Sequence, residues 1–212
     1  MAAETGRATY ALRFNVDYPQ RLDRLRTAFR AVWLLPIVVV LGAIGGGAVL
    51  FGSEEVVGGV AAGGGMVVGG PALMIVFRRK YPRWWFDWNL ELTRFISRIG
   101  ASFALLTDDY PSTDEQQAVH VEIDYPDVER DLNRWLPLVK WLLALPHYVV
   151  LLFLGIAEIF VVVFAWFAIL FTGRYPRALF GFVAGVGRWQ NRVIAYAFLM
   201  VTDEYPPFSL DE

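Results

Sequence analysis

Few side chains in this 212-residue sequence are placed to carry out chemistry. Cysteine is absent, which excludes disulfides, thiolate zinc sites and cysteine nucleophiles. Of the two histidines, His147 follows a proline at the start of an apolar segment, and no second histidine or cysteine is placed to complete a metal site with it. We interpret His147 as an interfacial hydrogen-bonding residue, with a proton-relay or metal role as the alternative. We expect no catalytic residue, metal or cofactor, and hence no enzyme.

Two pairs of arginines are suited to bind anions. Arg94 and Arg98 lie four residues apart, as do Arg188 and Arg192, so each pair shares one face of a helix. One interpretation is that they hold lipid phosphates at the cytoplasmic leaflet of a membrane. The preferred interpretation is ion pairing with nearby aspartates, for which the candidates are Asp17, Asp108, Asp124 and Asp203.

The composition indicates a membrane protein. Hydrophobic residues make up 56% of the chain and charged residues 19%, which is more apolar than is usual for a soluble domain. The formal net charge of −2 gives no general attraction to nucleic acid. Arginines precede the first long apolar segment, so we expect that segment to act as an uncleaved insertion signal.

Three short markers occur twice in the same order, which predicts two tandem repeats. We place the repeats at residues 1–115 and 116–212, because the polar stretch 112–117 reads as a linker. The first copies of the markers are Asn15–Pro19, Tyr81–Arg83 and Thr107–Pro111, and the second copies are Glu122–Pro126, Tyr175–Arg177 and Thr202–Pro206.

Each repeat begins with apolar residues at every second position, which predicts a half-buried strand. The two strands are expected to pair across a pseudo-twofold axis, since pairing would satisfy their edges. The alternating residues are Tyr10, Leu12, Phe14 and Val16 in the first repeat and Val119, Val121 and Ile123 in the second.

A membrane hairpin is predicted to follow each strand. Residues 31–77 contain two spans of roughly twenty residues on either side of a polar break at 52–55. Basic residues at both ends predict that both ends face the cytoplasm. The apolar segment 141–171 is also interpreted as a hairpin that bends near Gly155–Glu158, with one long helix as the open alternative. Glu158 would then lie at a solvated tip, and a coupling carboxylate of a transporter is its other interpretation.

An amphipathic helix is predicted after each hairpin, over about 85–106 and 179–200, from apolar residues at steps of three and four. Such a helix suits the bilayer interface, or its apolar face packs on the hairpins. Small residues four apart in the first apolar region allow close helix approach to the other repeat or to another protein. These are Gly42 with Gly46 and Gly59 with Gly63.

Three stretches of the second half are similar to a known family: Leu145–Tyr148, Ala165–Arg177 and Thr202–Phe208. They resemble the uncharacterised bacterial membrane family called domain of unknown function 4389, which is frequent in actinobacteria. The resemblance is strong over roughly residues 117–210 and weaker over 8–111, which implies two tandem copies. The family has no established activity, so the resemblance implies class and location and supplies no catalytic residues.

The sequence therefore predicts a mainly α integral membrane protein of two repeats, each a short strand, a membrane hairpin and an interfacial amphipathic helix. The expected function is a non-catalytic accessory or scaffold subunit in the bacterial cytoplasmic membrane, multi-pass, with its basic ends in the cytoplasm. Expected partners are membrane lipids and a membrane protein or further copies of the chain. The alternatives are a small transporter or channel, and a lipid-binding module.

Overall fold

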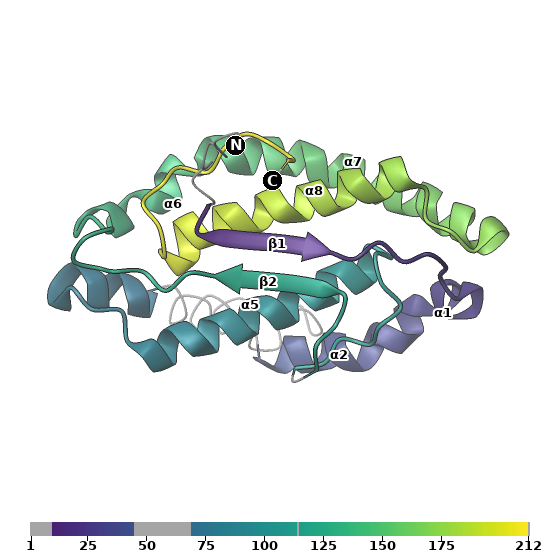
Figure 1. Cartoon of the computed structure of the whole chain (residues 1–212), viewed down its shortest axis with the longest axis horizontal. Coiled ribbons are helices and arrows are strands. Elements are labelled where there is room, and N and C mark those ends of the chain that lie inside the picture. The colour runs from purple at the N-terminus through teal and green to yellow at the C-terminus, as the bar shows by residue number, and fades with distance from the viewer. Residues whose placement is uncertain (1–9, 45–68, 114, 212) are drawn as a thin grey trace, which may run out of the picture.

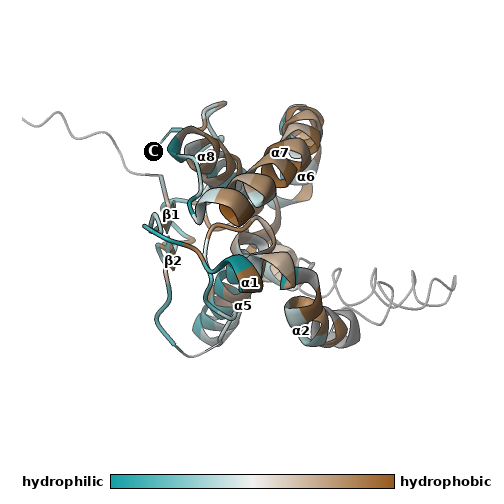
Figure 2. Ribbon diagram, turned by 90° about the vertical axis from the view of Figure 1, so that its right-hand side faces the viewer, coloured by the Kyte–Doolittle hydropathy of each residue, from teal (hydrophilic) through white to brown (hydrophobic). Residues whose placement is uncertain are grey.

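A computed structural model describes residues 10–44, 69–113 and 115–211, which are mainly helical and lie in three layers. The first layer is a two-stranded sheet of β1 (Leu12–Val16) and β2 (Val119–Ile123). The middle layer holds α5 (Arg83–Phe103) and α8 (Arg177–Ile194), and the third holds α2 (Arg30–Ile44) and α7 (Leu145–Thr172), as Figure 2 shows. The strands and the long helices all run along the long axis of the molecule (Figure 1).

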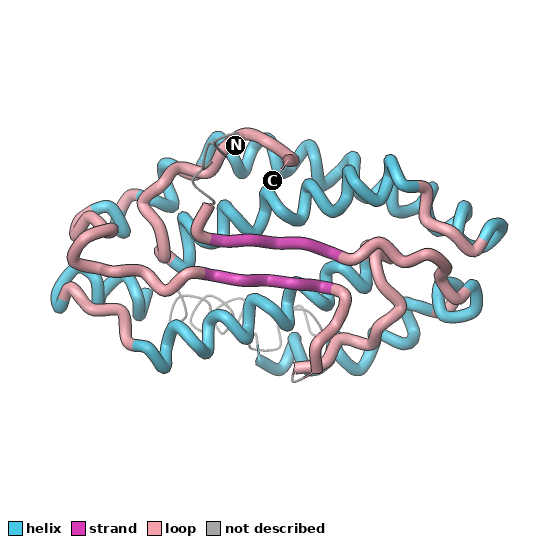
Figure 3. The backbone as a smooth tube through the Cα atoms, viewed as in Figure 1, coloured by secondary structure: helices cyan, strands magenta, loops and turns pink. Residues whose placement is uncertain are grey.

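Short elements connect these layers, mostly at the ends of the molecule (Figure 3). A five-residue helix, α1 (Arg24–Ala28), precedes α2, and α6 (Lys140–Leu143) precedes α7. The remaining short elements are a π-helical turn at Met74–Arg78, a 3-10 turn at Leu136–Leu138 and a second π-helical turn at Ala195–Leu199.

The predicted pairing of the two strands is confirmed. β1 and β2 are antiparallel, with Leu12 opposite Ile123 and Val16 opposite Val119. In both strands burial alternates, so that the apolar side chains enter the core and the polar ones face outward. The alternation in the sequence was therefore a sufficient signal for both strands and for their buried faces.

Each strand packs on a helix from the other half of the chain. β1 lies against α8, and β2 lies against α5. Two glycines of α8 permit close approach: a Cβ at Gly187 would lie 3.2 Å from the Phe14 ring, and one at Gly185 would lie 2.9 Å from Cβ of Leu210. The two halves are thus joined through one shared core.

The preferred hairpin in the second half is wrong, and the alternative of one long helix is correct. α7 continues without a break from Leu145 to Thr172 and ends at Gly173, whose φ of 70° lies in the left-handed region that favours glycine. Gly155 does not interrupt it, because one glycine costs a helix only about 1 kcal/mol. Glu158 consequently lies within the helix and not at a solvated tip.

The helices predicted over 85–106 and 179–200 are confirmed by α5 and α8. The interfacial position expected for them is wrong for α8, which is covered by β1 on one side and by α7 on another. Its buried residues therefore exceed one stripe and include Arg192 as well as Val186 and Trp189. The alternative, that the apolar face packs inside the protein, describes α8 correctly.

Candidate membrane-facing surface

The outer face of α7 is a continuous row of exposed apolar side chains. α7 has 28 residues and, among the residues that the structure describes, is the one helix long and apolar enough to cross a membrane. Only a small part of its surface is buried by the rest of the protein, because α8 and α1 cover its inner side alone. The exposed side chains include Val149, Phe153, Ile156, Phe160, Val163, Phe164, Phe167 and Phe171.

α2 extends this apolar face. Leu34 and Ile37 of α2 are buried against Ile99 of α5, so the opposite side of the helix points outward. That outer side exposes Val32, Trp33, Leu35 and Val39. α2 and α7 lie in the layer that is coloured hydrophobic in Figure 2, away from the sheet. We call the exposed apolar side chains of α2 and α7 the apolar face.

The opposite surface, formed by the sheet, is charged. Arg13 bonds to Glu122 (3.1 Å) and to Asp124 (2.9 Å) across the two strands. His120 lies 3.0 Å from Asp17 in the same outward-facing set. The molecule therefore has a charged side and an apolar side, separated by α5 and α8.

The two arginine pairs face the sheet and not the apolar face. Strand pairing leaves the carbonyls of Phe14 and Val121 pointing away from the partner strand, since residues on either side of them make the ladder bonds. Nε of Arg188 donates to the Phe14 carbonyl (3.2 Å), and Nε of Arg94 donates to the Val121 carbonyl (3.0 Å). Each arginine thereby satisfies an outer edge of the sheet.

The second arginine of each pair is more deeply buried and also binds backbone. Arg98 donates to the Ser112 carbonyl (2.6 Å). Arg192 donates to the Ser209 carbonyl (3.3 Å) and to that of Asp211. The four guanidinium groups are thus committed to main-chain carbonyls and one neighbouring carboxylate, Glu91. This structural role differs from both lipid binding and the predicted pairing with aspartates.

Two of the four candidate aspartates pair instead with basic residues that sequence reasoning missed. Asp203 lies 2.7 Å from Nζ of Lys140, which also donates to the Thr202 carbonyl (2.6 Å). Asp108 pairs with Arg30, which donates to the carbonyls of Thr107 and Ser102. Both marker aspartates also accept a backbone N–H, from Asn133 and Asp23 respectively.

Both cations of these pairs are buried. Burial lowers the pKa of the Lys140 amine, and the hydrogen bond from Asp203 opposes that change. Burial likewise lowers the pKa of Arg30, against the attraction of Asp108. The signal that would have found them is the lone basic residue just before each apolar segment, which recurs with each Thr-Asp-x-Tyr-Pro marker.

The Tyr-Pro markers make reciprocal contacts between the two halves. The Tyr18 hydroxyl donates to the Tyr175 carbonyl (2.5 Å), and the Tyr125 hydroxyl donates to the Tyr81 carbonyl (2.5 Å). Arg177 lies over the Tyr18 ring at 5.2 Å, and Arg83 lies over the Tyr125 ring at 4.6 Å. The tyrosines therefore hold turns together rather than marking a membrane interface.

His147 is fully buried in an aromatic cluster. Its Nδ1 accepts a hydrogen bond from the indole Nε1 of Trp189 (3.0 Å), and its ring stacks on Phe208 at 4.0 Å. Because Nδ1 is the acceptor, the imidazole is neutral with its proton on Nε2. His147 therefore secures the C-terminal segment to α7, a structural role inside the protein.

Glu158 is half-buried near the middle of α7, on the side that faces the core. It helps to raise the pKa of the Tyr175 phenol, for which burial is the larger cause. Glu158 and His147 lie eleven residues apart on the helix, so the structure does not bring the two polar candidates together. Within the described ranges, no group of three or more acidic or histidine side chains is arranged to hold a metal ion.

The glycine pairs fall mostly outside the described residues. Gly42 belongs to α2, whereas Gly46, Gly59 and Gly63 lie in the segment 45–68 that the structure does not describe. The polar break at 52–55 and the tip of the first hairpin lie there too. Close helix approach is visible nearby at Gly70, where a Cβ would lie 2.5 Å from the Trp85 ring.

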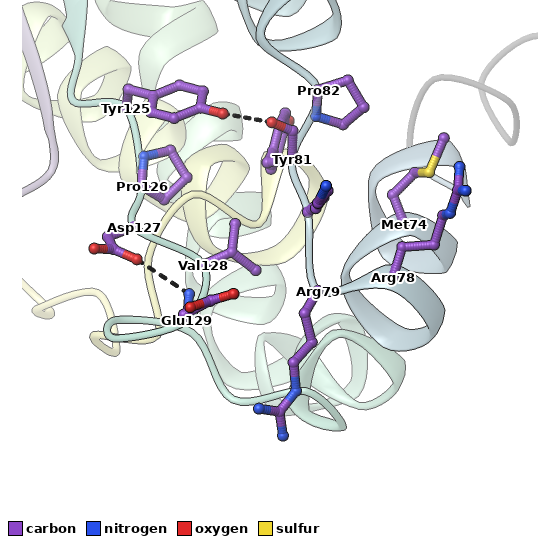
Figure 4. A pocket seen from close by; sticks show the side chains of 11 residues that line it. Met74, Arg78, Arg79, Tyr81, Pro82, Tyr125, Pro126, Asp127, Val128 and Glu129 are labelled. Atoms are coloured by element: carbon purple, nitrogen blue, oxygen red, sulfur yellow. Dashed lines mark hydrogen bonds between the residues drawn. The ribbon is translucent and has the colours of Figure 1, made fainter.

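A pocket of about 570 Å³ lies at one end of the molecule (Figure 4). Arg78, Arg79 and Lys80 line it together with two carboxylates, Asp127 and Glu129. Asp127 accepts a hydrogen bond from the backbone N–H of Glu129 (3.2 Å), and the Tyr125–Tyr81 contact forms one wall. The pocket is therefore of mixed charge.

One family model matches part of this chain. The matched segment is residues 135–209, and the family is described as Domain of unknown function (DUF4389). This stretch contains α6, α7 and α8 with the Lys140–Asp203 pair and the His147 cluster, so the predicted resemblance is confirmed there. The model matches once, and the second copy predicted over 8–111 stays a prediction. No curated protein and no solved structure shows a significant match to the chain.

Proposed function

We propose that this protein is a non-catalytic scaffold on the cytoplasmic side of the membrane, with its apolar face in the lipid and its sheet exposed to protein partners. The observation that carries the proposal is the alignment of α7 with the charged sheet: both run along the long axis, on opposite sides of the same body (Figures 1 and 2). The function is therefore a matter of placement rather than of reaction.

This alignment disfavours a crossing orientation for α7. If α7 stood along the bilayer normal, α8 and the strands would stand beside it at the depth of the hydrocarbon. Each charged side chain at the bilayer centre costs about 2.5–3.5 kcal/mol, and an open sheet edge has no place in hydrocarbon. The sheet carries several exposed charges, including Arg13, Asp17, Glu122 and Asp124.

An orientation in the plane of the membrane fits the surface better. A helix of 28 residues is about 42 Å long, well beyond the roughly 30 Å of a hydrocarbon core. Lying flat, α7 and α2 would immerse their outer side chains about 5–10 Å deep, as interfacial helices do. Exposed tryptophans of the same body, Trp33 and Trp141, suit that depth.

We also propose that the family unit occurs twice. Support comes from equivalent contacts in the two halves: Arg94 with Arg188 on the strand carbonyls, Arg30 with Lys140 on the marker aspartates, and the two Tyr-Pro exchanges. A doubled unit gives the scaffold one apolar helix per half. The accessory role follows from the charged sheet, which would face the cytoplasm and bind a partner of the membrane complex.

The multi-pass topology stays part of the proposal only for residues 31–77, whose middle lies outside the described residues. Its basic ends would face the cytoplasm, which agrees with a body lying on that side. The transporter alternative gains no support, since Glu158 faces Tyr175 within the protein.

The test is a depth profile along α7. Because the native chain has no cysteine, single cysteines at Val149, Ile156, Val163 and Phe171 can each carry a spin label in liposomes. Collision with oxygen and with a water-soluble nickel chelate then reports depth. We expect similar, shallow depths at all four positions, with a label at Asn15 on the sheet in water. A profile deepest at Ile156 and shallow at Val149 and Phe171 would show that α7 crosses the bilayer and would overturn the proposal.

A further inference from the structure

The end of the molecule formed by α1 and the C-terminus of α7 carries four exposed arginines: Arg21, Arg24, Arg174 and Arg177. They line two adjoining pockets of about 460 and 530 Å³. Arg21 and Arg174 belong to both pockets, so the four side chains surround one continuous hollow. We call these four residues the arginine cluster.

The backbone holds the cluster in place. The Leu22 N–H donates to the Gly173 carbonyl (3.0 Å), which joins the loop before α1 to the loop after α7. Gly173 takes its left-handed conformation at this junction, and the Arg24 guanidinium lies 3.5 Å from where a Cβ there would stand. Arg177 is positioned over the Tyr18 ring. The arginines are therefore presented by tied loops.

No arginine of the cluster has an ion pair with any other residue in the described part of the chain. The nearest carboxylates are committed elsewhere. Asp23 accepts the backbone N–H groups of Leu25 and Arg26 as the cap of α1, and Asp108 pairs with Arg30. Four uncompensated guanidinium groups around one hollow favour an anion with several acceptor oxygens.

The surroundings of the cluster indicate which anion. Phe171 is 79% exposed and Leu25 is 69% exposed, and both belong to the same end of the molecule as the cluster. An anion bound here would lie at the border between charged loops and the apolar face. A phospholipid satisfies both, since its phosphate meets arginine and its acyl chains meet Phe171 and Leu25.

We propose that the arginine cluster binds the phosphate of an anionic phospholipid headgroup. The proposal rests on the membrane-surface function above and adds the ligand class and its site. The opposite end of the molecule provides the contrast: its three cations share their pocket with Asp127 and Glu129 (Figure 4), so an anion gains little there.

The test compares two triple variants that each lose three positive charges. Arg21→Gln/Arg24→Gln/Arg174→Gln empties the cluster and leaves Arg177 on Tyr18, whereas Arg78→Gln/Arg79→Gln/Lys80→Gln changes the other end. Full-length protein is placed in nanodiscs of mixed phosphatidylcholine and phosphatidylglycerol, extracted gently, and its bound lipid is quantified by native mass spectrometry. Near-ultraviolet circular dichroism shows whether each variant keeps its packing.

We expect phosphatidylglycerol to be enriched over phosphatidylcholine on the wild-type protein. The cluster variant should lose about tenfold or more of that enrichment, since each cation near a headgroup contributes roughly fivefold, and the control should lose much less. Equal losses in the two variants, or no enrichment on the wild type, would overturn the site. Displacement of the lipid by an equal amount of inorganic phosphate would overturn the lipid assignment. The depth profile of α7 in the cluster variant is a separate readout: it stays unchanged if only the site fails.

Discussion

Arg188 donates a hydrogen bond to the carbonyl of Phe14, across 174 residues of sequence. The same contact is made once more by Arg94 on Val121 in the other half. A short two-stranded sheet is marginally stable by itself in water. These two side chains secure it by satisfying carbonyls that strand pairing leaves outside the ladder.

Replacing Arg188 by Gln should therefore destabilise the protein by about 1.5–3 kcal/mol, since a charge-assisted bond to a strand carbonyl is lost. Arg94→Gln should have a similar effect. Unfolding by denaturant in detergent, followed by circular dichroism, measures both. Arg83→Gln serves as the control, because its ion pair with Asp87 is exposed and contributes little. Equal stability of all three variants would show that the edge contacts contribute nothing.

Asp203→Asn should be among the most destabilising single substitutions. It leaves the buried ammonium of Lys140 without its counter-ion, at a cost of about 3–5 kcal/mol. The double variant Lys140→Met/Asp203→Asn removes the buried charge as well and should recover much of the loss. Thermal unfolding of the two variants provides the comparison. A double variant no better than Asp203→Asn would contradict the idea that an unpaired charge causes the damage.

Asp108→Asn should repeat this result through Arg30, if the two halves are equivalent. The ratio of the two losses measured under the same conditions is the useful quantity. A loss at one aspartate alone would count against the doubled unit.

The protein should lose stability in alkali. Burial is the largest cause of the raised pKa of Tyr10, Tyr81 and Tyr175 in the folded protein, relative to the ordinary phenol value of 10.0. A pKa raised by folding means that this stability is fully present below about pH 10 and is lost as the pH rises beyond it. The decline approaches about 1.4 kcal/mol per pH unit for each phenol. Denaturant unfolding at several alkaline pH values tests it, and Tyr81→Phe should remove one phenol's share.

Two glycines of α8 should respond oppositely to alanine. Gly181→Ala adds a methyl group that meets no atom within 4 Å and should stabilise the helix by up to about 1 kcal/mol. At Gly185 the same methyl group would meet Cβ and the carbonyl of Leu210, so Gly185→Ala should cost about 1–3 kcal/mol. The difference in melting temperature between the two variants decides the matter. A stabilising Gly185→Ala would show that the C-terminal segment yields easily.

Local patterns were sufficient for the elements whose partners obey simple rules. Alternation predicted both strands and their pairing, and periodicity predicted α5 and α8. The continuity of α7 was missed, because Gly155 and Glu158 look like a break when only polarity is considered. A glutamate is accommodated in an apolar helix when its side chain lies on the inward face.

The polar contacts were less predictable, because they join residues far apart in the sequence. Arg94, Arg98, Arg188 and Arg192 were rightly singled out, but their acceptors are carbonyls, which the sequence does not display. The arginine cluster went unnoticed, since Arg21 and Arg174 are brought together only by the junction at Gly173.

The exchange of strands between the halves bears on how such a unit exists alone. β1 packs on α8 and β2 packs on α5, so each strand completes the half to which it does not belong. A chain carrying a single unit would expose a bare strand edge and an uncovered helix. We therefore expect single-unit relatives to be obligate homodimers with twofold symmetry. Fusion of two units in one chain would make that association independent of concentration and allow the two halves to diverge.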